Sequence, residues 1–402
     1  MHWFTSIGLW LILPVWIGGM VYCGLALWAA RRFRSHSANH HEAPSSYEPF
    51  VSLLKPLSGH EPNLESNLES FFVQNYPSYE ILFAVNRADD PALDLAKRLH
   101  RRYPHIPARF VVAGPVQWPN AKVYSLEKMT ALAKADVLVI SDSDVQVGPD
   151  YVRRVVQPFA DQRVGVTTCV YRGVPGAGFW SRLEALAMSS AFMPGVLVAW
   201  AMEGMKFALG PTMAVRRKCL EAIGGFSGMA NYLADDFLLG NWAAREGYQV
   251  VLSPYVVDHH VLGTGFAATF KHRLRWARST RRSRPWGYVG QGFTHPLAAA
   301  LGLLLVAPHP LTWAAVAATL LMRWVINWSV SWQVLRDPHA RRGWWLVPLQ
   351  DLMEFVVWCA GFTGRIVMWR GVAYKVGREG RFELAESSGP VAEDELAAAR
   401  SQ

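Results

Sequence analysis

An uncharged stretch near the amino terminus places the strongest constraint on the fold. Residues 7–29 form 23 consecutive positions without Asp, Glu, Lys or Arg. As a helix rising 1.5 Å per residue, this stretch is long enough to cross the ~30 Å hydrocarbon core of a bilayer. Arg31, Arg32 and Arg34 follow it directly, and no Lys or Arg precedes it. The positive-inside rule therefore predicts an external amino terminus and a cytoplasmic remainder.

A cleaved signal peptide is the alternative interpretation of this stretch. Signal peptides have a charged n-region and a shorter apolar core, and the sequence has neither feature. We therefore expect residues 1–34 to be an uncleaved transmembrane anchor.

The composition supports a membrane-associated, folded chain. Hydrophobic residues make up 51% of the 402 positions and charged residues only 18%, whereas soluble chains carry about 25% charged residues. The net charge of +9 suggests a partner that is anionic: nucleic acid, a membrane surface or a phosphate-bearing substrate. The four cysteines lack the spacing of a zinc site or a disulfide framework and are expected to be reduced, mostly buried thiols: Cys23, Cys169, Cys219 and Cys359.

The carboxyl-terminal part contains further apolar segments. Residues 288–307 and 311–334 are separated by Pro308-His309-Pro310, and Arg336, Arg341 and Arg342 follow them. We predict a transmembrane hairpin that returns to the cytoplasm. Residues 344–369 carry Asp351, Glu354 and Arg365. Since charges at mid-bilayer are costly, this segment lies in the interface, re-enters or faces protein.

The chain end is predicted to be cytoplasmic. Basic residues follow the last apolar segment, and the acidic residues 383–402 are expected to be disordered. The predicted membrane region is therefore 286–378, and its basic end contains Arg365, Arg370, Lys375 and Arg378.

Residues 47–285 have the character of a globular α/β domain. Expected strands alternate with expected helices, which predicts a parallel, doubly wound sheet. Ligands of such sheets bind beyond the carboxyl ends of the strands. The strands are expected at 50–56, 80–86, 108–113 and 136–141, and the helices at 61–75, 94–103 and 123–134.

Two carboxylates follow the fourth expected strand. Asp142 and Asp144 lie two positions apart at the carboxyl end of a short apolar run. Such a pair suits Mg²⁺ or Mn²⁺ bridging a diphosphate, because both ions prefer oxygen ligands. A solvated turn is the alternative, since Asp is common after strands.

Two further acidic pairs follow the same pattern. Asp89 and Asp90 end the second expected strand, where they can reach a bound nucleotide or cap a helix. Asp235 and Asp236 precede an apolar helix. Capping explains one of these two carboxylates but does not readily explain both, and a carboxylate poised as a general base is the alternative.

A basic segment precedes the predicted hairpin. It contains Arg275 and Trp276, which can clamp a phosphate and offer a stacking surface. The alternative is a flank that contacts anionic lipid. His259 and His260 are adjacent, so at most one can ligate a metal, and we expect an ordinary surface or core role for both.

The apolar stretch 179–209 lies between the acidic sites. It is either a set of helices packed on the sheet or an amphipathic layer that admits a lipid to Asp236. In the second interpretation Met188, Phe192 and Met193 contact the lipid. The flexible thioethers of the two methionines can adapt to the irregular shape of a lipid. Pro194 is expected to break the segment.

Together these motifs resemble the inverting, membrane-bound glycosyltransferases of the ceramide glucosyltransferase family. The resemblance runs from Pro49 to about Val376. It is carried by the three acidic sites followed by Arg275-Trp276, and by Leu54-Lys55-Pro56-Leu57 and Asn120-Ala121-Lys122-Val123. His272 stands where the family has Gln or Arg, and no His occurs in 189–194, where the animal ceramide enzymes have one. The bacterial branch associated with hopanoid biosynthesis is the most similar.

The resemblance implies a GT-A type (Rossmann-like) glycosyltransferase domain with transmembrane helices. It implies transfer of glucose or N-acetylglucosamine from a UDP-sugar to a lipid hydroxyl, most simply that of a hopanoid polyol, with ceramide as the alternative acceptor. Asp142 and Asp144 would hold the metal and Asp236 would take the proton. The remaining implied contacts are the nucleotide-sugar for Asp89, Asp90, Lys122, Asp142 and Arg275, and the acceptor for Asp235 and Trp276.

Three other functions compete with this interpretation. A processive polysaccharide synthase needs a transmembrane channel, and three or four segments are few for that. A non-enzymatic scaffold is disfavoured because the acidic residues are intact at all three sites. A nucleic-acid binder would use the positive charge, but the basic run adjoins apolar segments, which favours lipid headgroups. We expect a multi-pass protein, most simply of a bacterial inner membrane, with a cytoplasmic catalytic domain.

Overall fold

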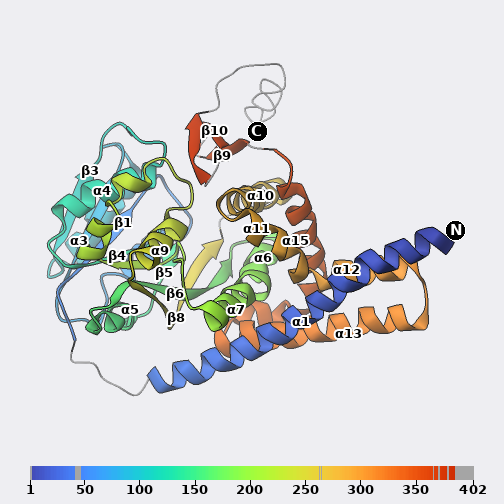
Figure 1. Ribbon diagram of the computed structural model, residues 1–402. Coiled ribbons are helices and arrows are strands. Elements are labelled where there is room, and N and C mark those ends of the chain that lie inside the picture. The colour runs from blue at the N-terminus through green and yellow to red at the C-terminus, as the bar shows by residue number, and fades with distance from the viewer. Residues whose placement is uncertain are drawn as a thin grey trace.

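The computed structural model describes residues 2–40, 47–261, 263, 265–364, 366–369, 372–377 and 380–384. An α/β domain contains an eight-stranded sheet, and a group of long helices extends away from it (Figure 1). The amino-terminal helix α1 (His2–His40) runs through this helical group, with its first turns at the end remote from the sheet.

Four parallel strands form one half of the sheet, and all four lie where the sequence predicts them. Every residue of β2 and β4 is buried, as expected for strands covered on both faces. In spatial order the strands are β3 (Ala108–Val112), β2 (Tyr79–Val85), β1 (Val51–Pro56) and β4 (Val137–Ile140). Two of the predicted helices are also present, as α3 (Pro91–Arg102) and α4 (Ala121–Leu132).

The first predicted helix is shorter than expected. Instead of residues 61–75, α2 covers only Leu64–Glu69. Asn63 has a left-handed backbone, with φ of 63°, so the helix does not begin earlier. Beyond the helix, the chain turns so that Phe71 and Phe72 enter the core, where they are at most 2% exposed.

The other half of the sheet is mixed, so the prediction of a wholly parallel sheet is wrong beyond β4. β7 (Met213–Arg216) runs antiparallel to both β4 and β6 (Val164–Pro175). The chain between β6 and β7 contains α6 (Phe179–Ala187), η2 (Met188–Phe192) and α7 (Met193–Glu203). Because this helical segment joins β6 to β7 at one edge, β7 must run back across the sheet.

Two more strands complete the sheet, and, like β6 and β7, they were not identified in the sequence analysis. β8 (Gln249–Val261) pairs parallel to β6, and β5 (Val145–Gln146) pairs antiparallel to β8 at the edge. The remaining helices of the domain are α5 (Tyr151–Val156), η1 (Gln157–Ala160), α8 (Arg217–Ala222), η3 (Ser227–Met229), α9 (Asp235–Arg245) and α10 (Phe266–Ser283).

Three helical segments of the described chain are long and apolar enough to cross a membrane. They are Ile7–Ala38 within α1, Phe179–Glu203, and Pro310–Val334, which joins α13 (Pro310–Asn327) to the π-helical η5 (Trp328–Val334). The predicted first span and the second arm of the predicted hairpin are therefore present as helices of sufficient length.

The first arm of the predicted hairpin is not one straight helix. Residues 288–307 include part of α11 (Pro285–Gly290), then η4 (Gln291–Thr294) and α12 (Pro296–Val306), with a bend of 62°. Pro296 causes the break, because it has no backbone N–H and disfavours helical geometry at the residue before it. His295 accordingly leaves the helical region, with ψ of 53°.

The predicted break at Pro194 is also wrong. The helical segment continues from Phe179 to Glu203. Pro194 lies just after the π-helical turn η2. A π-turn changes the backbone hydrogen-bonding pattern, so the missing N–H of proline is accommodated without ending the helix.

The last apolar segment packs on protein rather than forming a complete span. It contains η6 (Trp344–Leu346) and α15 (Val347–Gly361). Asp351 of α15 is 6% exposed and accepts two 2.7 Å hydrogen bonds from Arg323 of α13. The sequence left three possibilities for residues 344–369: a position in the interface, a re-entrant segment, or contact with protein. Around Asp351 the structure shows contact with protein.

A small antiparallel sheet follows α15 and was not predicted. Residues 366–369, expected within the apolar segment, form its strand β9. The predicted basic residues Arg365, Arg370 and Arg378 lie outside the described residues, as does the tail from 385 onward. The three strands are β9 (Ile366–Trp369), β10 (Val372–Val376) and β11 (Phe382–Leu384).

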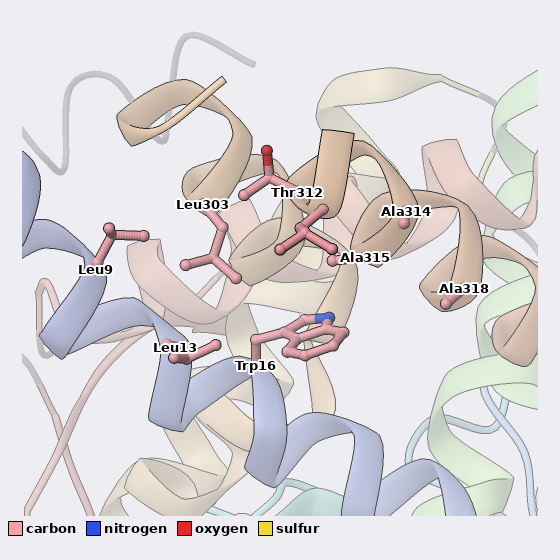
Figure 2. Close-up of a pocket in the computed structure, with 9 residues that line it drawn as sticks. Leu9, Leu13, Trp16, Leu303, Thr312, Ala314, Ala315 and Ala318 are labelled. Carbon is pink, nitrogen blue, oxygen red and sulfur yellow. The ribbon is translucent and has the colours of Figure 1, made fainter. Parts of the chain in front are cut away.

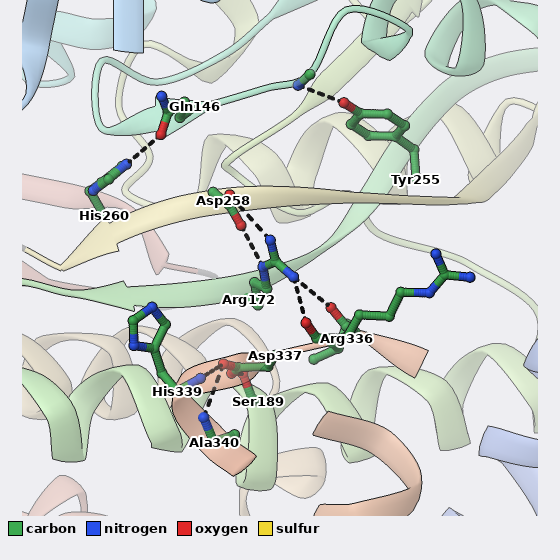
Figure 3. A network of polar contacts seen from close by, with 12 residues as sticks. Gln146, Arg172, Ser189, Tyr255, Asp258, His260, Arg336, Asp337, His339 and Ala340 are labelled. Carbon is green, nitrogen blue, oxygen red and sulfur yellow. Dashed lines mark hydrogen bonds and ion pairs between the residues drawn. The ribbon is translucent and has the colours of Figure 1, made fainter. Parts of the chain in front are cut away.

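Polar contacts fasten the sheet to the helical group (Figure 3). Arg172 of β6 donates to Asp258 of β8 at 2.5 Å and to the carbonyl oxygen of Arg336 at 2.6 Å. Ser189 of η2 donates to Asp337, at the start of α14 (Pro338–Arg342), at 2.6 Å. The end of the α13–η5 segment is thus held against two strands and against η2.

An apolar cleft of about 420 Å³ lies among α1, α12 and α13, far along the helical group (Figure 2). Its walls include Leu13, Trp16 and Leu303, and none of its lining residues is titratable. The indole of Trp16 donates to Thr319 at 2.9 Å beside it. This cleft offers apolar contact but no group for acid–base chemistry.

Candidate active site

The candidate site lies at the carboxyl edge of the parallel strands. β4 ends at Ile140, and the turn through Asp142 and Asp144 leads into β5. The backbone N–H of Val145 donates to the carbonyl oxygen of Asp142 at 3.4 Å, which closes this turn. Both carboxylates are half-buried and stand where ligands of an open α/β sheet bind.

Lys122 joins two of the acidic sites that the sequence predicted. Its ammonium lies 2.8 Å from Asp142 and 3.2 Å from Asp235. Although burial lowers its pKa, these two carboxylates raise the pKa of Lys122 above its ordinary value. Asn120 caps α4 and also donates to the carbonyl oxygen of Tyr232 at 2.8 Å, so the start of α4 is tied to the loop before α9.

His259 is a member of the site that the sequence analysis missed. Its Nε2 lies 3.1 Å from Oδ2 of Asp144. Burial acts to raise the pKa of Asp144, but the neighbouring His259 lowers it below its ordinary value. Nothing in the sequence around His259 indicates its contact with Asp144. The two side chains meet only because Val145, the neighbour of Asp144, pairs with His259 between β5 and β8.

Lys55 is a second missed member. It is fully buried at the end of β1, and its ammonium donates to the carbonyl oxygen of Asp142 at 2.6 Å. Burial lowers the pKa of Lys55 to about 7, although Asp142 and Asp144 oppose this shift. A lysine inside an apolar strand was the available signal, since charged residues are almost never fully buried without a partner.

Asp236 lies at the first turn of α9 and approaches Asp142 around Gly210. A methyl group on Gly210 would lie 3.3 Å from Oδ2 of Asp236 and 3.7 Å from Oδ2 of Asp142. Burial raises the pKa of Asp236 to about 6, and Asp235 adds to the shift. A carboxylate with this pKa suits a general base near neutral pH.

The other predicted nucleotide contacts have structural partners of their own. Asp89 is exposed and pairs with Arg87 at 2.5 Å. Asp90 caps α3 through a 2.9 Å bond from the N–H of Ala92, and it also accepts from the N–H of Gly59 at 3.0 Å. Asp90 thus fixes the loop after β1, beside the carboxyl edge.

The predicted Arg-Trp pair lies on α10. Among the described residues Arg275 has no hydrogen-bond or ion-pair partner, and burial lowers its pKa. Trp276 packs on the core and contacts the ring of His272, with centroids 4.5 Å apart. His272 in turn lies 2.6 Å from Glu184 of α6.

The three predicted acceptor contacts differ in exposure. Met188 and Met193 are 3% and 0% exposed and belong to the hydrophobic core. Phe192 is 42% exposed, and its ring centroid lies 5.8 Å from that of Tyr171. Tyr171 also contacts the ring of His259 at 5.6 Å. Phe192 therefore connects the apolar helical segment to the acidic site.

The acidic pair has the chemistry of a partial metal site. No group of three or more His, Cys, Asp or Glu side chains within the described ranges can hold an ion by itself. Oδ1 of Asp144 is nevertheless buried without a hydrogen-bond partner. With Asp142 it supplies carboxylate oxygens, which fit Mg²⁺ or Mn²⁺ when substrate oxygens and water complete the coordination.

The sequence matches a known family along most of its length. Residues 11–382 match glycosyl transferase family 21. The chain belongs to this family. The family match and the mixed sheet confirm the predicted α/β domain of GT-A type. The helices Ile7–Ala38 and Pro310–Val334 match two of the predicted apolar segments in length and composition.

Curated relatives of this family 21 chain include lipid glycosyltransferases. Ceramide glucosyltransferase 3 of Caenorhabditis elegans is 24% identical over 250 residues, which are 62% of this chain and 54% of that protein. The ceramide glucosyltransferase of Komagataella phaffii is 39% identical over 101 residues, 24% of this chain and 20% of that protein. The β-monoglucosyldiacylglycerol synthase of Trichormus variabilis is 24% identical over 241 residues, 57% of this chain and 48% of that protein.

The chain spans about half the length of the nematode relatives that it matches. Solved structures are more distant. The mannosyltransferase PcManGT of Pyrobaculum calidifontis, in complex with GDP-Man and Mn²⁺, is 18% identical over 85% of this chain and 98% of its own, with a TM-score of 0.47. S. aureus TarS with UDP-GlcNAc is 14% identical over 84% of this chain and 99% of its own, with a TM-score of 0.41.

Proposed function

We propose that this family 21 chain transfers a hexose from a UDP-sugar to the hydroxyl group of a membrane lipid, with inversion at the anomeric carbon. The observation that carries the proposal is the meeting of Asp142, Asp144 and Asp236 at the carboxyl edge of the sheet. This edge adjoins the apolar segment Phe179–Glu203, which is long enough to cross a membrane. A water-soluble donor and a lipid can therefore meet there.

The donor end of the site is assigned to the β4 turn and α10. Asp142 and Asp144 would hold Mg²⁺ or Mn²⁺, and the ion would neutralise charge on the diphosphate. Lys122 keeps Asp142 in place through its 2.8 Å contact. Arg275, which has no protein partner among the described residues, can bind a phosphate oxygen bidentately as the nucleotide leaves. Asp90 acts on the nucleotide through the Gly59 loop that it fixes.

The chemical step is assigned to Asp236. Its carboxylate takes the proton from the acceptor hydroxyl, and the acceptor oxygen attacks the anomeric carbon from the face opposite the nucleotide. The new glycosidic bond forms as the bond from the anomeric carbon to the diphosphate breaks, so UDP leaves with the electron pair. A single displacement of this kind inverts the anomeric configuration. Trp276 and Asp235 border the acceptor side.

The acceptor is proposed to be a polyhydroxylated lipid of the hopanoid class, receiving N-acetylglucosamine or glucose. One departure from the animal ceramide enzymes favours this over ceramide: residues 189–194 lack the His that those enzymes have. Ser189 is used instead for a 2.6 Å bond to Asp337. The relatives that act on ceramide and diacylglycerol lipids keep ceramide as the second candidate.

The proposed arrangement in the membrane has residues 1–34 as an anchor, 47–285 as a cytoplasmic domain and 286–378 as the carboxyl-terminal membrane region. We propose a multi-pass protein of a bacterial inner membrane. The basic residues after α12–α13 and after the anchor support this orientation.

The decisive experiment is sugar transfer by the purified full chain in mixed micelles. Radiolabelled UDP-glucose and UDP-N-acetylglucosamine are each supplied with a hopanoid polyol, ceramide or diacylglycerol. We expect one labelled glycolipid of inverted anomeric configuration, with the hopanoid polyol as the preferred acceptor. Label in water-soluble polymer, or no transfer to any lipid, would contradict the proposal.

A further inference from the structure

The helical segment Phe179–Glu203 is as long and as apolar as a membrane span, yet both of its ends are attached to one strand of the sheet. Near its start, Ser181 donates a 3.4 Å hydrogen bond to the carbonyl oxygen of Val261, at the end of β8. Just beyond its other end, Met205 pairs with Val250, near the beginning of β8. The sheet therefore holds the segment at both ends.

The lengths of the helix and the strand agree with this attachment. Between the two attachment points the helix rises about 33 Å at 1.5 Å per residue. The strand covers about 36 Å at ~3.3 Å per residue between the same points. The helix thus runs along β8 in the opposite direction. α6 also packs closely on the sheet, since a methyl group on Gly173 of β6 would lie 2.6 Å from Cα of Ala185.

A helix attached in this way crosses a bilayer only if the sheet crosses with it. Open sheet edges do not occur in hydrocarbon, because their N–H and C=O groups would lose the hydrogen bonds of water. Burial points the same way: 61% of the most apolar stretch of Phe179–Glu203 is buried inside the protein, against 17% for Ile7–Ala38. Figure 1 shows α6 and α7 between the sheet and the α12–α13 pair. The segment is therefore a part of the domain, with both ends on the domain's side of the membrane.

One face of the segment is nevertheless apolar and open. Phe192 and Met202 are 42% and 64% exposed, and Gly195 and Ala199 between them are partly exposed. Their spacing of three and four residues places these four positions on one side of a helix. We call them the apolar stripe. Leu197, on the opposite side of α7, is fully buried.

Contacts with α1 show which part of a membrane the stripe meets. A methyl group on Gly195 would lie 3.8 Å from the hydroxyl of Tyr22, inside the uncharged stretch of α1. Nη1 of Arg32, in the basic flank of α1, donates to the carbonyl oxygen of Ala201 at 2.8 Å. Glu203 follows as the first charged residue of α7. The apolar part of α7 is thus level with the end of the uncharged stretch of α1, and the charged residues of both helices begin together.

We propose that η2 and α7 are embedded in the cytoplasmic leaflet without crossing the bilayer, and that the apolar stripe contacts lipids of that leaflet. The inference rests on the membrane orientation given under the proposed function. The stripe begins at Phe192, whose ring contacts Tyr171, and the ring of Tyr171 contacts His259. A single aromatic side chain therefore separates the stripe from the acidic site, so the acceptor lipid comes from the same leaflet.

The first test locates the two ends of the segment. Arg182→Cys and Glu203→Cys, both at exposed positions, are made in the full chain with the exposed Cys359 replaced by Ser. Membrane vesicles of both orientations are treated with a membrane-impermeant thiol reagent, and the Cys359→Ser chain gives the background. We expect both cysteines to react in inverted vesicles, and labelling of both to be lost in right-side-out vesicles.

Two results of this labelling would overturn the inference. Reaction of the two cysteines from opposite faces would show that the segment spans the bilayer, and it would leave the proposed sugar transfer intact. Reaction of both from the external face alone would overturn the inference together with the cytoplasmic orientation of the domain.

The second test identifies what the stripe contacts. A nitroxide spin label is attached at Ala199→Cys or Met202→Cys in the same Cys359→Ser chain, purified into phospholipid nanodiscs. Access of the label to oxygen and to a water-soluble nickel complex is then measured. Val21→Cys, at a 58% exposed position in α1, is the lipid reference, and Val73→Cys, at a 47% exposed position in the α/β domain, is the water reference.

We expect the stripe labels to resemble the lipid reference, with loss of access to nickel and a depth of about 5–10 Å below the headgroups at position 199. A stripe label as open to nickel as the water reference would overturn the lipid contact. A label closed to both probes, with dipolar broadening, would show a second copy of the chain on the stripe and would also overturn it.

These measurements do not depend on catalysis. A protein that transfers no sugar to lipid but shows the expected labelling would refute the proposed function and leave the embedded segment standing. Thermal melting of each variant checks folding. If Ala199→Cys does not fold, the more exposed Met202→Cys decides the second test.

Discussion

The ammonium of Lys122 lies 2.8 Å from the carboxylate of Asp142 and thereby connects the first turn of α4 to the end of β4. The same ammonium reaches Asp235 at 3.2 Å. One cation therefore holds two acidic segments that are far apart in the sequence. Close carboxylates repel each other unless a cation lies between them, so the ammonium of Lys122 offsets the repulsion between Asp142 and Asp235 at the same edge of the sheet.

The first prediction concerns the metal. Asp144→Asn should reduce sugar transfer at least ~100-fold, because a metal ion supplies several kcal/mol of charge stabilisation at a diphosphate. EDTA should have the same effect on the wild type, and added Mg²⁺ or Mn²⁺ should reverse it. Transfer is measured with the protein in detergent, with thermal melting as the folding control. Full activity of the wild type in EDTA would remove the metal from the mechanism.

Much of the parallel half of the domain is predictable because its signals are local. Short apolar strands and alternating helices mark β1 to β4, and the acids of Asp142 and Asp144 stand directly after β4. The antiparallel half cannot be predicted in the same way, because the direction of β7 depends on how the segment Phe179–Glu203 returns the chain to the sheet. That segment is as apolar as a membrane helix, and nothing local in the sequence shows that 61% of its most apolar stretch is buried inside the protein.

The contact between His259 and Asp144 shows why part of the site escapes sequence analysis. The two residues are 115 positions apart. They meet only because β5 and β8 pair in one register, and a shift of one residue would turn the imidazole to the other face. The Arg-Trp pair, by contrast, is a local motif that can be seen in the sequence itself, and both residues lie on α10.

The second prediction concerns pH. A general base must be deprotonated, and burial raises the pKa of Asp236 to about 6. The kcat/KM for the acceptor should therefore be constant well above pH 6 and fall about tenfold per unit well below it. The residual rate of Asp236→Asn should lack this inflection, which separates Asp236 from other titrating groups such as His259. A flat wild-type profile from pH 7.5 to 5 would argue against Asp236 as the base.

The third prediction concerns the buried ion pair between α13 and α15. Arg323 and Asp351 are 3% and 6% exposed, and Arg323 also donates to the carbonyl oxygen of Ser190 at 3.0 Å. Arg323→Met should destabilise the protein by about 3 kcal/mol, because it leaves Asp351 buried and unpaired. Replacing both residues by Met and Leu should recover part of this loss.

Thermal melting in detergent measures the effect of the ion pair. The matched control is the exposed pair of Lys206 and Glu203, whose side chains are 55% and 45% exposed. Lys206→Met should melt close to the wild type, since exposed pairs contribute little. Equal melting temperatures for Arg323→Met, Lys206→Met and the wild type would show that the buried pair does not stabilise the fold.

The fourth prediction concerns topology. Reporter fusions at Arg34 and Arg336 should both read cytoplasmic, and one at His309 should read external. The arginines after each apolar segment set this orientation, and His309 caps α13 at the turn between the two arms. An external signal from the reporter at Arg34 would show the opposite orientation, in which the acidic site cannot meet cytoplasmic UDP-sugar.

The last prediction concerns the apolar wall near the acidic site, where Phe192 and Met193 are adjacent but differently exposed. Phe192→Ser should raise the KM for the lipid roughly five- to tenfold, because the 42% exposed ring loses its apolar contact with the acceptor. The KM for the UDP-sugar should stay nearly unchanged. Met193→Ser should instead lower the melting temperature, since this side chain is fully buried. Steady-state kinetics in mixed micelles provides both constants. If Phe192→Ser raises both KM values equally, the lipid enters by another wall.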